Sequence, residues 1–135
     1  MEKQVIPFEV PWSAEVAHLL TGATGTEPTY SISDLQNEVE TGRAQLFQWH
    51  FGDEVLGYSV LWIDAFGGLS EMVVQAGAAF KSDKRAFRLV MPVIETMAKN
   101  QGCYAVRSHL VDGRWAGNFR SAGFYKSEVV MRKRL

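Results

Sequence analysis

The amino-acid sequence predicts an α/β (α+β) fold in which helices flank a mixed, mostly antiparallel sheet. Three observations favour this class: strand-like segments follow one another across the middle of the chain, a long amphipathic helix comes after them, and strands then alternate with helices. The expected order of elements is β-α-α-β-β-β-α-β-α-β. With 135 residues, 47% of them hydrophobic and 21% charged, the chain has the length and composition of one domain, residues 1–135.

The first third of the chain predicts one strand and two short helices. Valine, isoleucine and phenylalanine residues favour a strand over residues 3–10. A helix over 11–20 begins at a proline, which is tolerated in a first turn, and Ser33 is a suitable N-cap for a second helix over 34–41. Residues 21–29 contain two glycines and a proline, and we expect them to form a loop.

The middle of the chain predicts a three-strand antiparallel meander. Alternating side chains favour a strand over 44–51, and residues 55–63 favour a returning strand because they are rich in β-branched and aromatic side chains. A Gly-Asp pair supplies the hairpin turn between these two strands. Two consecutive glycines then turn the chain into a third strand over 69–75.

The clearest helix covers residues 84–101. Its apolar side chains recur every three or four residues, as expected for one buried face. They are Phe87, Val90, Met91, Ile94 and Ala98. Pro92 is expected to kink this helix and Gly102 to end it. A strand over 104–111, a helix over 113–122 and a final strand over 124–132 complete the predicted fold.

The formal net charge of −1 conceals two oppositely charged halves. Residues 1–71 carry eleven acidic and two basic residues, which gives −9, whereas residues 72–135 carry four acidic and twelve basic residues, which gives +8. This asymmetry suggests two different ligand-facing surfaces.

Several classes of protein are disfavoured by the composition. No apolar run approaches the roughly 20 residues of a membrane span, and no export signal is visible at the N-terminus. The single cysteine, Cys103, cannot form an internal disulfide, which favours a reducing compartment. The three histidines lie far apart in the sequence, so we expect no metal site. We therefore expect a cytoplasmic protein with no membrane partner.

Basic residues gather at the start of the long predicted helix, where Lys81, Lys84, Arg85 and Arg88 are offset only by Asp83. Cations at a helix N-terminus are individually unfavourable by roughly 0.3–1 kcal/mol, because that end already carries partial positive charge. Such a cluster is explained if an anion, such as a phosphate, occupies the site. The alternative is a solvated basic face.

Glu71 is the second candidate for a functional residue. In the predicted strand it shares a face with Leu69 and Val73, so a carboxylate stands among apolar neighbours. A desolvated carboxylate can act as a general base near neutral pH. The alternative is an edge position or a twist that exposes Glu71 to solvent.

The order of elements and several residues together resemble the GNAT superfamily of acyl-CoA-dependent N-acetyltransferases over nearly the whole chain. In that family a strand leads into the pattern Gln/Arg-x-x-Gly-x-Gly/Ala, and the matching stretch here is Lys81-Ser82-Asp83-Lys84-Arg85-Ala86. Lys81 keeps the base and Ala86 keeps the small residue. Gly102 matches the glycine that follows the family's long helix, and Gly123-Phe124 matches its Gly-Phe pair.

The sequence departs from the family pattern at three positions. Lys84 stands where the family prefers a glycine beside the CoA pyrophosphate; its side chain can crowd the phosphates, although its charge could partly substitute. Phe119 stands where a tyrosine often protonates the departing thiolate, and Asp112 replaces a frequent asparagine. Glu71 matches the region where many members keep a catalytic glutamate.

The resemblance implies acetyl-CoA as co-substrate, no metal and an amine acceptor. The acyl-CoA would lie across Met72, Val73 and Val74, with its pyrophosphate at residues 81–86, and Glu71 would deprotonate the amine directly or through water. The remaining cofactor-binding positions that it implies are Lys81, Ser82, Asp83, Lys84, Arg85, Ala86, Asp112 and Phe119. The acceptor, a small molecule or a peptide, would meet the acidic region around Glu27, Asp34, Glu38 and Glu40, whose charge suits a cationic amine.

A second resemblance, to short GNAT-like proteins of tailed phages, rests on residues 25–30 and 84–87. It implies a catalytically silent GNAT-fold protein with a structural or interaction role and a virion partner. A homodimer is the alternative partner that we expect. Nucleic-acid binding through the basic half is a third hypothesis; the acidic half and the lack of a known nucleic-acid motif disfavour it.

Overall fold

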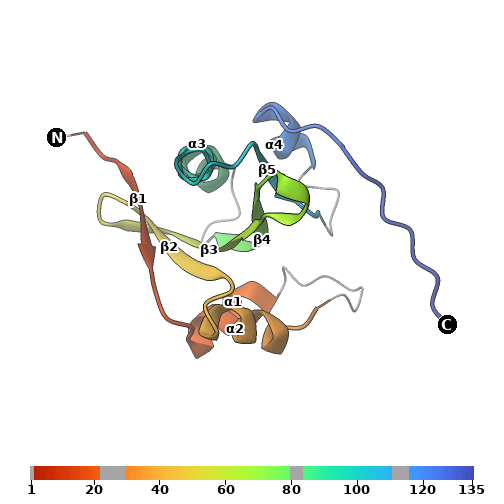
Figure 1. Cartoon of the computed structure of the whole chain (residues 1–135). Coiled ribbons are helices and arrows are strands. Elements are labelled where there is room, and N and C mark those ends of the chain that lie inside the picture. The colour runs from red at the N-terminus through yellow and green to blue at the C-terminus, as the bar shows by residue number, and fades with distance from the viewer. Residues whose placement is uncertain (1, 22–29, 80–83, 111–115) are drawn as a thin grey trace.

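The computed structural model describes residues 2–21, 30–79, 84–110 and 116–135 (Figure 1). The strands are β1 (Val5–Glu9), β2 (Gln45–Phe51), β3 (Glu54–Asp64), β4 (Glu71–Ala79) and β5 (Ala105–Ser108). The α-helices are α1 (Ala14–Leu20), α2 (Ile32–Glu40), α3 (Arg85–Asn100) and α4 (Ala116–Ser121), and a short 3-10 turn covers Phe66–Gly68. The predicted order of elements is therefore confirmed up to its last strand.

The strands form one mixed sheet in chain order, β1-β2-β3-β4-β5. Neighbours from β1 to β4 are antiparallel, and β4 and β5 are parallel. The parallel pair is joined through α3, because a parallel connection needs a crossover longer than a hairpin. In the predicted hairpin Phe51 pairs with Glu54, and Gly52 between them has a φ of 60°, which favours glycine. The mixed sheet and its central meander are thus confirmed.

The helices cover the two faces of the sheet (Figure 1). α1 and α2 lie on one face, where Leu20 of α1 and Leu35 of α2 are buried against Leu46 of β2 and Val60 of β3. Each of these side chains is at most 2% exposed. The apolar faces of the two short helices therefore close one half of the core.

α3 covers the opposite face of the sheet. Its buried residues, Val90, Met91, Ile94 and Ala98, are those expected from the helical period, with Phe87 packed beside them. They surround Trp49 of β2, which is 1% exposed and whose Nε1 donates a hydrogen bond of 2.9 Å to Ser59 Oγ. A buried indole N–H needs such a partner, so Ser59 is the polar residue that the core accommodates.

The predicted start of α2 is wrong by two residues. Ser31, rather than Ser33, is the N-cap, because its Oγ accepts from the Asp34 N–H at 3.1 Å while Asp34 Oδ2 accepts from the Ser31 N–H at 2.8 Å. This reciprocal capping box lengthens the helix and brings Ile32 against the core. At the other end of the fold Gly102, with a φ of 79°, follows α3 as predicted.

The predicted final strand over 124–132 is also wrong. Residues 124–135, the C-terminal segment, have no regular structure and run to one side of the sheet without pairing with it (Figure 1). Tyr125, Val129 and Met131 are 83%, 71% and 89% exposed. The residues of the C-terminal segment favour a strand by their side-chain pattern. A strand forms only where a neighbouring strand pairs with it, however, and no described strand pairs with this segment.

Candidate functional site

One open stretch of the sheet lies along the second half of β4, between its pairing with β5 and its end. β4 pairs with β5 only from Glu71 to Val74, where the Ser108 hydroxyl donates to the Val74 carbonyl at 3.2 Å. Residues 76–79 continue the strand and pair with β3 alone among the described strands, and Gln75 lies at a bulge where the register with β3 shifts. The other edge of this stretch therefore carries backbone groups to which β5 does not hydrogen-bond.

The predicted acyl-CoA strand residues lie just before this open edge. Met72 and Val73 are each 4% exposed, and Val74 is half-buried. All three pair with β3 on one side and β5 on the other. Their backbone groups are occupied within the sheet, so the stretch that β5 leaves open begins after Val74, and within it the Gln75 carbonyl already accepts from the Tyr30 hydroxyl.

Two cations remain exposed at the start of α3. Lys84 is the N-cap and makes no side-chain capping hydrogen bond, and Arg88 lies one turn further on. Neither side chain forms an ion pair with another described residue. Ala86 is half-buried and packs against the α3 side of the core. The predicted positions Lys81, Ser82, Asp83 and Asp112 lie outside the described residues.

Arg85 differs from the expectation that it faces an anion. Its Nη1 donates to both carboxylate oxygens of Glu54, at 2.9 Å each, and its guanidinium lies 5.4 Å from the centre of the Phe51 ring. Glu54 and Phe51 flank the β2–β3 hairpin turn, so the contact ties α3 to the hairpin. Because Glu54 offsets its charge, Arg85 contributes less to an anion site than the sequence suggests.

Glu71, the predicted base, belongs to a cluster of three charged residues on adjacent strands. Arg107 of β5 donates to Glu71 Oε1 at 3.0 Å through Nη1 and to Asp64 Oδ2 at 3.1 Å through Nη2. The side chains of Glu71, Asp64 and Arg107 are 24%, 27% and 21% exposed. Glu71 thus faces a charged partner instead of the apolar surroundings expected from its neighbours in sequence.

Opposing influences act on Arg107. Burial lowers the pKa of its guanidinium, but hydrogen bonds and charges from Asp64 and Glu71 outweigh burial and raise the pKa above its ordinary value. The guanidinium is therefore charged throughout the physiological range. Its Nε is buried and has no hydrogen-bond partner among the described residues. The three groups together carry one net negative charge.

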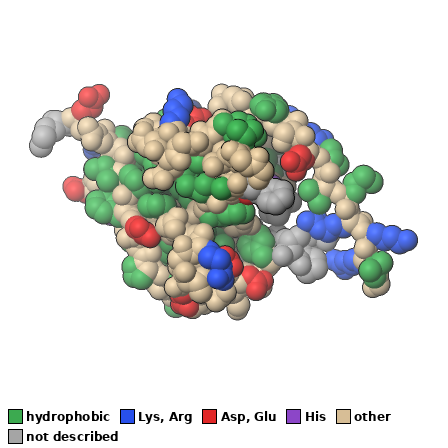
Figure 2. All heavy atoms as spheres, in the orientation of Figure 1, with side chains coloured by type: hydrophobic (Ala, Val, Ile, Leu, Met, Phe, Trp, Pro, Cys, Tyr) green, Lys and Arg blue, Asp and Glu red, His purple; other side chains and the backbone are tan. Residues whose placement is uncertain are grey.

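A groove of about 1230 Å³ is lined by Arg107 of this cluster, whereas Glu71 and Asp64 are not among its lining residues. Its floor consists of side chains from β3, β4 and β5, namely Val60, Trp62, Gln75, Arg107 and Ser108. One wall comes from α2 and its surroundings, with Tyr30, Asp34, Leu35, Glu38 and Ala44. The other wall comes from residues 109–110, from α4 and from the C-terminal segment, whose Lys and Arg side chains gather at the right of Figure 2.

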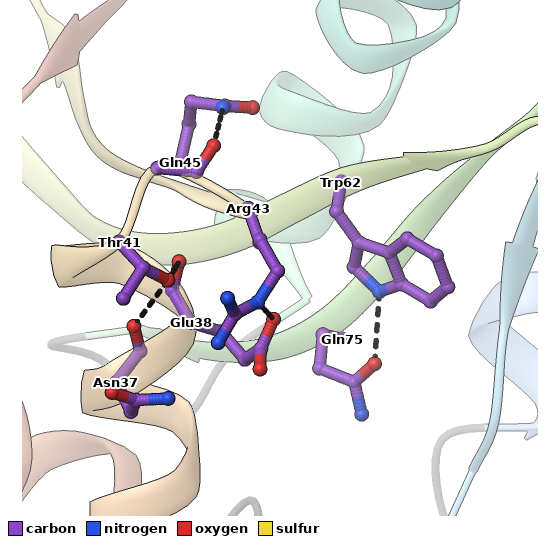
Figure 3. Close-up of polar contacts among 8 residues, drawn as sticks. Asn37, Glu38, Thr41, Arg43, Gln45, Trp62 and Gln75 are labelled. Atoms are coloured by element: carbon purple, nitrogen blue, oxygen red, sulfur yellow. Dashed lines mark hydrogen bonds and ion pairs between the residues drawn. The ribbon is translucent and has the colours of Figure 1, made fainter.

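Three residues of the groove, Tyr30, Trp62 and Gln75, were not predicted as site residues from the sequence. The Tyr30 hydroxyl donates to the Gln75 carbonyl at 3.1 Å, and Trp62 Nε1 donates to Gln75 Oε1 at 3.0 Å. Figure 3 shows Trp62 and Gln75 meeting side by side, with the Glu38–Arg43 ion pair nearby. Burial raises the pKa of Tyr30, so its hydroxyl stays protonated as a donor at neutral pH. Trp62 and Gln75 belong to different strands, so only the register of β3 with β4, which shifts at a bulge beside Gln75, brings them together, and no local signal places Tyr30 there.

Phe119 packs as an aromatic residue of the core. Its ring lies 4.8 Å from that of Phe87 and 5.0 Å from that of Phe124, both edge to face. It also lines the groove. Phe119 therefore joins α4 to α3 and offers no hydroxyl to a reaction.

The described ranges contain neither a cluster of metal ligands nor a membrane-spanning helix. No three His, Cys, Asp or Glu side chains there lie close enough together to hold a metal ion. No helix there is long and apolar enough to span a membrane.

Known structures identify the fold. The chain is similar to an acetyltransferase from Trypanosoma brucei, with 18% identity, a TM-score of 0.63 and coverage of 98% of this chain and 100% of that one. An aminoglycoside N-acetyltransferase in complex with CoA matches with 13% identity and a TM-score of 0.60, over 100% of this chain and 97% of that one. Glucosamine-6-phosphate N-acetyltransferase from Arabidopsis thaliana matches with 9% identity and a TM-score of 0.59, over 97% and 98%.

The similarity to known proteins is one of fold and not of sequence. No family model matches the chain, and no curated protein matches its sequence. The structural likenesses, at 9–18% identity, show that the chain has the fold of the GNAT acetyltransferases. The predicted fold is thereby confirmed, and the acceptor and the catalytic residues stay predictions.

Proposed function

We propose that the chain is an acetyl-CoA-dependent N-acetyltransferase that acts on an amine held in the groove. The observation that carries the proposal is the open edge of β4 over residues 75–79. This edge begins at Gln75 in the groove floor, and α3, with Lys84 as its N-cap, is the next described element of the chain after β4. A cofactor laid along it would have one end at the acceptor and the other at the exposed cations.

The chemistry of these residues fits acetyl-CoA. Amide groups along the CoA arm can pair with backbone N–H and C=O groups of an open strand edge, as an added strand does. Lys84, Arg88 and the N-terminal N–H groups of α3 suit a pyrophosphate. The predicted contacts of Lys81, Ser82, Asp83 and Asp112 remain part of this proposal, as do those of Met72, Val73 and Val74 through their side chains.

Glu71 is proposed as the general base. Acetyl-CoA, when bound, supplies the acetyl group as a thioester. Because Glu71 does not line the groove, its carboxylate accepts a proton from the ammonium group of the acceptor through water, and so frees the nitrogen lone pair. The nitrogen then bonds to the acetyl carbon while the carbon–sulfur bond breaks. The second proton lost from nitrogen passes through water to the sulfur, because Phe119 has no hydroxyl to donate.

Replacing Arg88 by Gln is expected to weaken acetyl-CoA binding about tenfold, since it removes one charge-assisted contact to the pyrophosphate. Replacing Arg85 by Gln at the same helix end is expected to change the affinity less than about twofold, because Glu54 already offsets its charge. Calorimetry measures the dissociation constant of acetyl-CoA for each variant and so checks both expectations. Equal weakening by the two substitutions would contradict the assigned phosphate site.

The transfer itself is tested by following free thiol release from acetyl-CoA. With a panel of primary amines, thiol release is expected to depend on both the amine and the protein, and mass spectrometry should find the amine heavier by one acetyl group. If the protein binds acetyl-CoA but no amine of the panel causes thiol release, the proposed transferase activity is contradicted.

A non-catalytic interaction protein is the second candidate. Two observations favour it: Phe119 lacks the hydroxyl, and the Glu71 carboxylate is already paired with Arg107. In this case the exposed cations of α3 would meet acidic groups of a partner, which for a phage protein would be a virion component. Binding of such a partner at equal stoichiometry, with no thiol release, would favour this candidate.

A further inference from the structure

We infer that the acceptor is a small zwitterion, which carries a carboxylate or a phosphate in addition to the amine. The inference rests on the proposed function and names the substrate class of the same groove. Its basis is the charge of the groove, whose two walls carry opposite signs.

The α2 wall offers two carboxylates to an ammonium group. Asp34 uses Oδ2 in the capping box at the start of α2. Its other carboxylate oxygen, Oδ1, can therefore accept a hydrogen bond from an ammonium group. Glu38 accepts from Arg43 Nε at 2.8 Å through Oε2, so Arg43 offsets part of its charge, but both side chains are about half exposed and the pair is worth little. Tyr30 and Leu35 line the same wall and make it partly apolar.

The facing wall offers three cations to an anionic group. Arg120 of α4 and Lys126 and Arg132 of the C-terminal segment line the groove, and all three are exposed. None forms an ion pair with a described residue. Glu128 is the one acidic side chain that the C-terminal segment adds to the groove. An anionic group there would thus gain contacts that no carboxylate of the described chain already makes.

The two walls together select against simpler acceptors. A polyamine would be attracted to Asp34 and Glu38 but repelled by the uncompensated cations opposite them. A neutral amine would satisfy one wall only. A zwitterion satisfies both and is oriented by them, with its amine toward α2, and the groove volume of about 1230 Å³ is ample for a small molecule.

The test compares amines that differ only in the anionic group: β-alanine with β-alaninamide, and O-phosphoethanolamine with ethanolamine. The first readout is direct binding, followed through the NMR shift of the Trp62 indole N–H, which lies in the groove floor. The anionic member of each pair is expected to bind about tenfold more tightly. Equal affinity within both pairs, or no shift of the indole by any of the four up to about 0.1 M, would overturn the inference.

A variant pair assigns the preference to the C-terminal wall. The double substitution Lys126→Gln and Arg132→Gln is expected to abolish the preference, whereas Lys99→Gln with Lys133→Gln, which removes two cations outside the groove lining, should retain it. Retention in the first variant would contradict the inference. Preferential zwitterion binding without thiol release from acetyl-CoA would leave the charge inference standing and reject the proposed transferase, so the two failures are distinguishable.

Discussion

The substitution Glu71→Gln is expected to lower kcat for amine acetylation about 100-fold or more, with the affinity for acetyl-CoA unchanged. General-base catalysis contributes roughly 10²–10⁴-fold to a rate, and an amide cannot accept the proton. Glutamine keeps the size of the side chain and an oxygen to accept from Arg107. Steady-state kinetics together with calorimetry of acetyl-CoA check the rate and the affinity separately.

Asp64→Asn is the matched control for this substitution. Asp64 and Glu71 accept from the same guanidinium at 3.1 and 3.0 Å and are similarly exposed, at 27% and 24%. Both amides weaken the cluster, but only one removes the proposed base. Asp64→Asn is therefore expected to retain kcat within about fivefold. Similar losses in the two variants would mean that the cluster acts through the structure of the sheet and that Glu71 is not the base.

The largest expected effect on stability follows from Trp49→Ala. The Trp49 side chain is 1% exposed and packs against the α3 side of the core, and its removal also takes away the donor to Ser59 Oγ. Truncating a buried tryptophan costs about 3–5 kcal/mol, from lost burial and the cavity left behind. Urea denaturation followed by circular dichroism measures the free energy of unfolding of both proteins.

Trp12→Ala is the corresponding control, because Trp12 is only half-buried at the edge of the α1–α2 side of the core. Its expected cost is about 1–2 kcal/mol, in proportion to the apolar area that it buries. An equal or larger loss for Trp12→Ala would show that the core around Trp49 does not dominate the stability of the fold.

Most of the fold could be predicted from local patterns. The meander follows from alternation and turn residues, and α3 follows from the spacing of Val90, Met91, Ile94 and Ala98, because each pattern is a property of the segment itself. The strand over 124–132 could not be excluded in this way. Its residues favour a strand, but pairing depends on a neighbour elsewhere in the chain.

The site was predictable in part, for the same reason. The strand pattern indicates the face of Glu71, and the helix pattern places Lys84, Arg85 and Arg88 at the start of α3. Partners could not be predicted, because the pairing of Arg107 with Glu71 depends on the register of two parallel strands that are far apart in sequence. The pairing of Arg85 with Glu54 likewise depends on how α3 packs against the hairpin.

The acidic and basic halves of the chain contribute oppositely charged side chains to the same groove. Asp34 and Glu38 belong to the acidic half, and the cations that face them belong to the basic half. The net charge of −1 therefore conceals two opposed walls of one groove.

The central claim is that acetyl-CoA binds along the open edge of β4. The most direct test is a titration of the protein with acetyl-CoA, followed by the backbone amide NMR signals. Binding tighter than about 1 mM is expected, with shifts concentrated in residues 75–79 and the first turn of α3 and none in β1, on the far side of the sheet. No shift at any amide up to about 10 mM acetyl-CoA, or shifts that leave residues 75–79 unchanged, would contradict the claim.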